Sequence, residues 1–259
     1  MRHLAATMAC LLLLPAAAQA QPRELMDLYT HLHTHPELSF HEADTAATLA
    51  SELEALGFAV TTQVGGHGLV GVLENGEGPT VLLRTDLDAL PVKEQTGKAY
   101  ASTVTATDDA GNTVPVMHAC GHDVHMTVFV GTARQLVEQR DRWAGTLVMI
   151  GQPAEERGAG ARAMLADGLF ERFPRPDYNL ALHVSAALPA GSIGYTEGYA
   201  LASVDSVDIK VFGVGGHGAY PHTTKDPVVL SAQIINALQT LVARVIPPVE
   251  PGVVTGGAI

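Results

Sequence analysis

The chain has 259 residues, of which 47% are hydrophobic and 16% are charged, a composition ordinary for a globular protein with a buried core. Its formal net charge is −12, and the sequence contains no run of lysine or arginine. Because phosphate binding requires clustered basic side chains, nucleic acid is excluded from the expected partners.

Residues 1–20 are predicted to be a cleaved signal peptide. A short positive start precedes the apolar stretch 4–17, and Ala18 and Ala20 supply the small residues that signal peptidase requires. The apolar stretch is broken by Pro15 and is short for a membrane span, which needs about 20 residues. We therefore expect a periplasmic or secreted protein without stable membrane association, with an uncleaved anchor as the alternative.

Cleavage would leave one cysteine in the mature chain. Cys10 lies in the predicted signal peptide, and Cys120 then has no partner for an intramolecular disulfide. A lone thiol in an oxidising compartment is a liability unless it is buried or bound to a metal. A redox role for Cys120 is therefore excluded, and a nucleophile or a metal ligand remains.

Helical spacing of apolar residues predicts helices over 23–35 and 42–56, with Gly57 as the residue that ends the second. Apolar strands then alternate with helices: strands over 68–74, 80–86, 145–156 and 178–184, and helices over 125–140 and 160–170. This order predicts an α/β fold with a helix-covered, largely parallel sheet.

The pattern changes after about residue 200. Residues 203–214 alternate like a half-exposed strand, 226–245 form a long amphipathic helix, and 252–259 begin another strand. We expect a first domain over 21–199 and a second, incomplete domain over 200–259, in a chain truncated at its C-terminus.

Ligands bind outside the carboxyl ends of the strands in such sheets. Polar side chains stand at these ends, and a cysteine and histidine segment enters a helix from the same side: Asp86, Asp88, Glu155, Glu156, His183 and residues 117–123. We expect these groups to meet at one edge of the sheet.

This set of side chains is typical of a metal site. If 118–122 is extended, His118, Cys120 and His122 share one face. Thiolate and imidazole suit zinc, and carboxylates widen the choice to manganese. Adjacent glutamates on a strand end diverge, so one of Glu155 and Glu156 can bind a metal while the other moves a proton of the attacking water.

Other histidines are expected to be structural. The "HLHTH" run at 31–35 lies at a helix end without a carboxylate pair, His41 and His67 are isolated, and His125 is assigned to helix packing. A rival interpretation makes Cys120 a nucleophile activated by histidine. The glutamate pair and the later histidine would have no role in that chemistry.

Five motifs occur in an order that resembles the M20 metallopeptidase family: "RTDLDALPVKEQTG" (84–97), "MHACGHDVHMT" (117–127), "GQPAEE" (151–156), "ALHV" (181–184) and "GGHGAYPH" (215–222). The likeness runs from about residue 24 to the end. It is similar in particular to the amidohydrolase branch, which includes hippurate hydrolases, N-acyl-amino-acid amidohydrolases and auxin-conjugate hydrolases.

The resemblance implies a zinc-peptidase-like catalytic domain, an inserted α+β lid domain that forms a homodimer, and two divalent metal ions, zinc or manganese. It implies the metal ligands Cys120, His122, Glu156 and His183. Glu155 matches the general base, and Asp88 matches an acidic residue that orients groups near the metals. His217 matches a lid histidine that reaches the partner's active site and steadies the oxyanion.

The sequence departs from the family pattern in two places. The family's fifth ligand, a histidine near the C-terminus of a longer chain, and the second half of the catalytic domain have no counterpart in the 259 residues. The family's "RNVDP" after the lid helix is "RVIPP" at 244–248.

The expected reaction is hydrolysis of the amide bond of an N-acyl-amino acid or small peptide by metal-activated hydroxide, with Glu155 as general base. The alternatives are a dipeptidase or carboxypeptidase of the same family, a hydrolase that uses Cys120 as nucleophile, and an inactive truncated fragment that only binds metal.

Overall fold

The computed structural model describes residues 23–198, 200 and 203–259, so the predicted signal peptide lies outside the described residues. The chain divides into two compact units between Ser192 and Ile193. The first unit contains the central sheet, and the α/β class expected from the sequence is confirmed.

A five-stranded sheet forms the centre of the first unit. In spatial order its strands are β1 (Ala59–Thr62), β2 (Leu69–Asn75), β6 (Gly145–Gln152), β3 (Thr80–Asp86) and β7 (Tyr178–Ala181). β2 pairs antiparallel with β1 and β6, whereas β3 pairs parallel with β6 and β7. Four strands therefore run in one direction and β2 alone runs against them, which confirms the largely parallel sheet.

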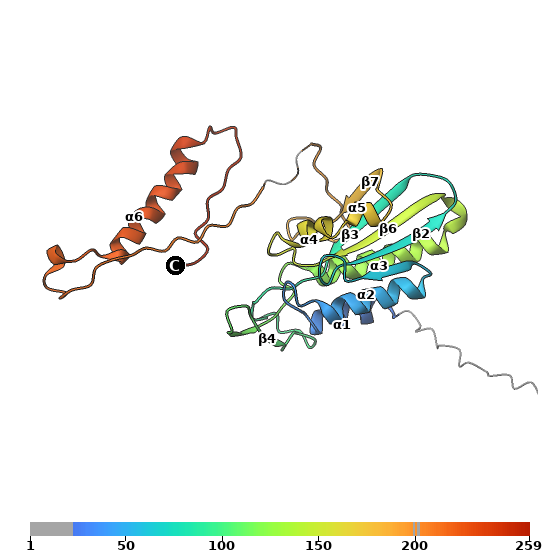
Figure 1. Cartoon of the computed structure of the whole chain (residues 1–259), viewed down its shortest axis with the longest axis horizontal. Coiled ribbons are helices and arrows are strands. Elements are labelled where there is room, and N and C mark those ends of the chain that lie inside the picture. The colour runs from blue at the N-terminus through green and yellow to red at the C-terminus, as the bar shows by residue number, and fades with distance from the viewer. Residues whose placement is uncertain (1–22, 199, 201–202) are drawn as a thin grey trace, which may run out of the picture. The chain divides into compact units, whose positions relative to one another are not determined.

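Helices cover both faces of the sheet, as Figure 1 shows. They are α1 (Leu25–Thr34), α2 (Ala43–Ala55), α3 (His122–Glu138), η1 (Arg140–Arg142), α4 (Gly160–Ala166) and α5 (Leu169–Arg172). Leu49, Phe129 and Met149 belong to the core between the first three helices and the sheet. Val148 and Met164 belong to the core on the opposite face. Neighbouring residues of β6 point to opposite faces, so an almost continuous apolar strand supplies both cores.

Element boundaries differ from the sequence prediction at several places. The strand expected over 145–156 ends at Gln152, and the strand expected over 178–184 ends at Ala181. Gly57 follows α2 with φ of +88°, which confirms its role after the helix. The sequence prediction missed β1 and the hairpin of β4 (Thr105–Thr107) and β5 (Thr113–Pro115).

The second unit contains η2 (Pro221–Thr223), α6 (Pro227–Thr240) and a π-helical continuation, η3 (Leu241–Val245). The Asp226 side chain caps α6 by accepting the amide N–H of Val228 at 2.8 Å. The helix Pro227–Val245 is long and apolar enough to cross a membrane, a test that single helices of soluble proteins also pass.

The strands expected over 203–214 and 252–259 are absent from the described residues, so that prediction is wrong. Val214 makes an isolated bridge to Lys225 instead. An alternating sequence becomes a strand only where a neighbouring strand satisfies its backbone, and these segments have none among the described residues.

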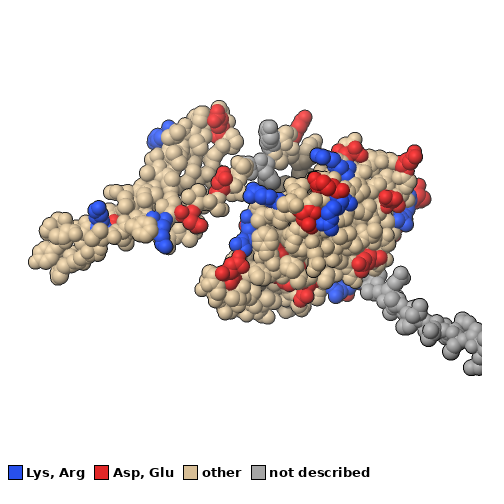
Figure 2. Space-filling view, viewed as in Figure 1, with Lys and Arg blue, Asp and Glu red and all other residues tan. Residues whose placement is uncertain are grey.

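Figure 2 shows acidic and basic side chains interspersed on the face in view, with no basic patch among the described residues there.

Candidate metal centre

The carboxyl ends of β3, β6 and β7 meet at one edge of the sheet. In the parallel ladders Asp86 pairs with Gln152, and Arg84 pairs with Ala181. The segments that follow these strands therefore leave the sheet side by side and carry Asp88, the glutamate pair and His183. The structure therefore brings Asp88, the glutamate pair and His183 to one edge of the sheet, as expected from the sequence.

Gly121 lies in the turn that precedes α3, so that the helix begins at this edge of the sheet. Its φ is +83°, and its N–H donates to the carbonyl oxygen of His118 at 3.3 Å. A Cβ at this position would lie 2.6 Å from Cγ2 of Val184. Glycine thus provides both the left-handed backbone and the close approach of the segment that carries His183. Cys120 precedes the turn and His122 follows it.

His122 is fully buried at the centre of the cluster. Its Nδ1 lies 2.7 Å from the backbone carbonyl oxygen of Asp88, and a carbonyl can only accept, so Nδ1 carries the proton. Nε2 is then left without a hydrogen-bond partner. It faces Oδ2 of Asp86 at 3.5 Å, Oε2 of Glu155 at 3.6 Å and Oε1 of Glu156 at 3.8 Å. This is the arrangement of a metal-binding imidazole fixed through its other nitrogen.

Asp88 organises the residues around His122. Its carboxylate is fully buried and accepts from the Ser39 hydroxyl at 2.6 Å and from the amides of Glu155 at 3.1 Å and Glu156 at 3.0 Å. Burial alone would raise the pKa of Asp88, but His122 and these donors outweigh it and lower the pKa. A charged Asp88 therefore holds the backbone of both glutamates.

The glutamate pair adopts a turn, because β6 ends before it. The expectation that the two side chains diverge, as in a strand, is wrong. Both carboxylates approach Nε2 of the same imidazole, with the side chain of Glu155 37% exposed and that of Glu156 17% exposed. The division of roles can still follow from exposure, because the more buried carboxylate suits a metal and the more open one can exchange protons with solvent.

Cys120 and His183 complete the cluster on its open side. Sγ of Cys120 lies 3.3 Å from Nε2 of His183. Nδ1 of His183 lies 2.7 Å from the carbonyl oxygen of Val184 and must donate to it, so the lone pair of Nε2 faces the thiol.

Three groups of side chains bring ligand atoms within 4.8 Å of one another: Cys120, His122 and His183; His122, Glu155 and Glu156; and Asp86, His122 and His125. The first two groups contain all four expected metal ligands. Two buried atoms among them, His122 Nε2 and Glu156 Oε1, have no hydrogen-bond partner. Buried polar atoms are normally paired, so these orphaned acceptors fit a divalent cation.

Charge in the cluster favours a cation. Burial alone would lower the pKa of His122, but the carboxylates of Asp88 and Asp86 outweigh it and raise the pKa to about 9. Burial and the nearby glutamates raise the pKa of the Cys120 thiol to about 11. In the metal-free chain, the His122 ring and the Cys120 thiol therefore hold protons where a divalent ion would bind.

His118 does not join the cluster, contrary to the sequence prediction. The chain turns at residues 119–120, so His118 and His122 do not share an extended face. His118 is buried, and burial lowers its pKa to about 4. Both of its nitrogens lack a hydrogen-bond partner among the described residues.

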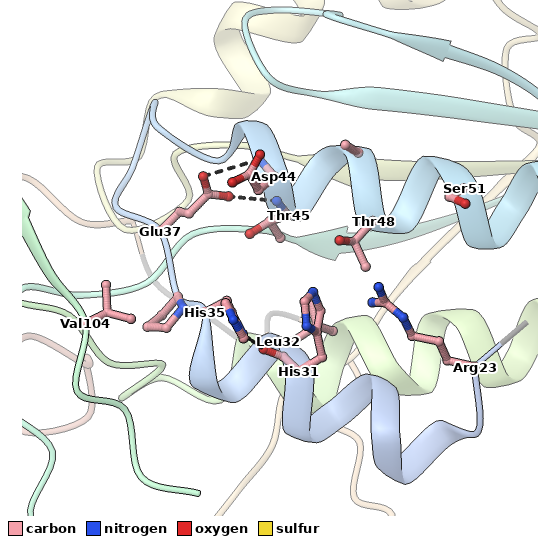
Figure 3. A pocket seen from close by; sticks show the side chains of 12 residues that line it. Arg23, His31, Leu32, His35, Glu37, Asp44, Thr45, Thr48, Ser51 and Val104 are labelled. Atoms are coloured by element: carbon pink, nitrogen blue, oxygen red, sulfur yellow. Dashed lines mark hydrogen bonds between the residues drawn. The ribbon is translucent and has the colours of Figure 1, made fainter. Parts of the chain in front are cut away.

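The histidines of 31–35 lie apart from the metal-ligand groups found in the described residues. His33 is buried and contacts Asp123 at 2.6 Å and Glu94 at 3.2 Å. His31 lines a cavity of about 610 Å³ between α1 and α2. Figure 3 shows its ring and the Arg23 side chain extending into this space, while the Glu37 carboxylate accepts backbone N–H groups at the start of α2.

Two members of the cluster, Asp86 and His125, have no predicted role at the site. The sequence places Asp86 at a strand end and predicts that His125 packs within its helix. His125 does pack in the core, but its Nδ1 also lies 2.8 Å from Oδ1 of Asp86. The available signal was spacing: His122 and His125 are three residues apart and share a helix face above the end of β3.

His217 lies in the second unit and is exposed. Its Nδ1 accepts the N–H of Ala219 at 3.1 Å, so a neutral ring carries its proton on Nε2, the form that can donate outward. Its expected role at a partner's active site stays a prediction.

Residues 82–258 match the model of the family described as Peptidase family M20/M25/M40. The match covers more than half of the chain, and the chain belongs to this family. The resemblance drawn from the five motifs is confirmed.

Two relatives of this chain are longer than the chain itself. YhaA of Bacillus subtilis (strain 168), named as an amidohydrolase, is 42% identical over 237 residues, which are 91% of this chain and 57% of YhaA. N-acetyl-L-cysteine deacetylase of the same organism is 35% identical over 246 residues, which are 95% of this chain and 56% of the deacetylase. The chain thus spans little more than half the length of either relative.

A solved structure supports the fold. The crystal structure of the Bacillus subtilis YXEP protein, described as a dinuclear metal binding peptidase from the M20 family, superposes with a TM-score of 0.61 at 31% identity. The alignment covers 83% of this chain and 55% of that protein. The metal binding described for that protein agrees with the groups of candidate metal ligands in this chain.

Proposed function

We propose that this protein hydrolyses the amide bond of N-acyl-amino acids with the help of two divalent metal ions. The observation that carries the proposal is the pair of buried, unpartnered acceptors, His122 Nε2 and Glu156 Oε1, beside Cys120 and His183. The N-acetyl-L-cysteine deacetylase among its relatives supports the N-acyl-amino acid class.

Cys120, His122, Glu156 and His183 would hold the ions. When bound, divalent cations polarise a carbonyl and lower the pKa of water. A mixed set of sulfur, nitrogen and oxygen donors suits zinc and tolerates manganese.

Glu155 is the general base. Its carboxylate lies beside His122 Nε2 and is the more exposed of the glutamate pair, so it can take a proton from the attacking water and return it to the leaving amine. Asp88 acts as a positioning residue, because its carboxylate holds the amide of Glu155 and its carbonyl fixes the His122 ring.

His217 donates a hydrogen bond to the oxyanion, from a second copy of the chain in a homodimer formed through the lid. The proton that the Ala219 contact leaves on Nε2 supports this role. The same protein is exported, and the apolar stretch ahead of residue 21 supports a periplasmic or secreted location.

Peptide hydrolysis is the second candidate, because the superposable YXEP protein is described as a peptidase. A cysteine hydrolase is disfavoured by the raised pKa of Cys120, since the thiolate is the nucleophilic form and a thiol with pKa about 11 is almost fully protonated at neutral pH.

A substrate panel with metal removal tests the proposal. The chain, loaded with Zn²⁺ or Mn²⁺, is assayed for release of free amino acid from N-acetyl- and N-benzoyl-amino acids and from dipeptides. We expect turnover of acylated amino acids that disappears on chelation and returns when metal is restored. Preference for dipeptides would favour the peptidase. Activity that resists chelation but is abolished by thiol alkylation would overturn the proposal, and bound metal without turnover would identify a binding protein.

A further inference from the structure

His125 connects the end of β3 to the segment that carries His183. Its Nδ1 lies 2.8 Å from Oδ1 of Asp86, and its Nε2 lies 3.0 Å from the amide nitrogen of Val184. The amide can only donate, so Nε2 accepts, and the neutral ring donates its Nδ1 proton to Asp86. His125 is 2% exposed, and both of its ring nitrogens are paired.

Val184 connects His125 to His183 through its backbone amide and carbonyl groups. Its amide is held by His125, and its carbonyl oxygen accepts the Nδ1 proton of His183 at 2.7 Å. The ring centroids of His125 and His183 are 4.6 Å apart at an interplanar angle of 69°. A change at His125 therefore reaches His183 both through one residue of backbone and through direct ring contact.

Sheet pairing does not extend to this segment. The β3–β7 ladder ends with the Arg84–Ala181 pair, two residues before His183. Beyond that pair, the backbone at Val184 is held by the hydrogen bond from its amide to His125 and by the close packing of Gly121 against the Val184 side chain.

We propose that His125 is a positioning residue that sets the side chain of His183 for metal binding by holding the Val184 amide. The inference rests on the proposed function, because it takes His183 as a metal ligand. Groups that orient metal ligands typically change metal affinity about 10–100-fold when removed.

Cobalt binding by the full chain tests this role. Metal-free protein is titrated with Co²⁺ against a chelator of known affinity, and the thiolate-to-Co²⁺ and visible absorption bands are recorded. We expect His125→Phe, which keeps a ring and removes both hydrogen bonds, to weaken Co²⁺ binding about 10–100-fold and to alter the visible bands. His125→Gln, whose amide group can donate to Asp86 and accept from Val184, should restore most of the affinity.

Met126→Leu is the matched control, because Met126 is the next residue of α3, is fully buried and lies in the apolar core. It should leave the affinity and the bands unchanged. If His125→Phe binds Co²⁺ as the wild type does, or if Met126→Leu loses as much, the positioning role is overturned while the proposed function stands. A wild-type chain without a thiolate-to-Co²⁺ band would overturn both.

Ring-nitrogen NMR of the Zn²⁺-loaded wild-type chain provides a readout that needs no variant. Long-range proton–nitrogen correlations should place the proton of His125 on Nδ1 and that of His183 on Nδ1. A His125 ring protonated on Nε2 would contradict the proposal, because it could not accept the Val184 amide.

Discussion

Replacing Asp88 by asparagine should both destabilise the fold and weaken metal binding. The buried carboxylate accepts three hydrogen bonds: Ser39 and the Glu156 amide share Oδ2, while the Glu155 amide uses Oδ1. An asparagine that keeps its oxygen at the Oδ2 position still serves two donors. Its NH₂ group then faces the Glu155 N–H, and two donors oppose each other.

The expected cost follows from these contacts. One charge-assisted hydrogen bond is lost, worth about 1.5–3 kcal/mol, and the two that remain become neutral and weaker. We therefore expect Asp88→Asn to lower the free energy of unfolding by about 2–4 kcal/mol. Metal affinity should fall as well, because the segment that carries the metal ligand Glu156 loses the contact at the Glu155 amide and keeps only a weaker one at the Glu156 amide.

Urea unfolding of the metal-free chain measures the first effect through the fluorescence of Trp143, the single tryptophan, which packs against the core of the first unit. Zn²⁺ titration measures the second. Ser39→Ala is the matched control, since it removes one donor but leaves both glutamate amides bonded to Asp88, and it should lower stability without weakening metal binding. A loss below about 1 kcal/mol for Asp88→Asn, or equal metal affinities in the two variants, would refute this reasoning.

Four further substitutions have defined outcomes. Gly121→Ala should cost about 1–2 kcal/mol for the left-handed backbone and should also weaken Zn²⁺ binding, because the new Cβ meets Val184 at 2.6 Å. Gly57→Ala is the control, because Gly57 has φ of +88° and nothing lies within 4 Å of the new Cβ, so it should show only the backbone cost in urea unfolding. Equal Zn²⁺ affinities of the Gly121→Ala and Gly57→Ala variants would contradict the argument. Burial alone would raise the pKa of Asp86, but its histidine and arginine contacts lower it from 3.8 to about 2. Its charge therefore stabilises the metal-free fold above pH 3.8, and about 2 kcal/mol should be lost as the pH falls from about 4 to about 2. Urea unfolding across this pH range should show that the free energy of unfolding falls less steeply with acid in Asp86→Asn than in the wild type. An equally steep fall in the variant would contradict this role of the Asp86 charge. Glu155→Gln should keep bound metal by elemental analysis while hydrolysis falls about 10²–10⁴-fold, and near-normal turnover would remove Glu155 from its role as base.

The sheet and the site edge could be predicted because their signals are local. The residues of β2 and β3 form short apolar runs bounded by glycine, proline or a charged residue, and β3 was predicted with its observed bounds. The direction of the strands then places everything that follows β3, β6 and β7 at one edge. The convergence of Asp88, the glutamates and His183 follows from this direction, because each of them comes directly after one of these strands.

What the sequence could not show depends on turns and on partners far along the chain. His118 leaves the cluster because the chain turns at residues 119–120, and the glutamate pair stays together because β6 ends early. The role of His125 depends on the Val184 amide, 59 residues away. Residues 203–214 have strand-like alternation, but a strand also requires a neighbour, which a periodic pattern does not encode.

Anomalous X-ray diffraction at the zinc absorption edge, from crystals of the chain loaded with Zn²⁺, tests the proposed metal centre most directly. We predict anomalous peaks about 2.3 Å from Cys120 Sγ and about 2.0–2.1 Å from Nε2 of His122 or His183, with a Glu156 oxygen completing the set. Saturating zinc with no peak among these four side chains, or a peak only at the histidines of 31–35, would contradict the account.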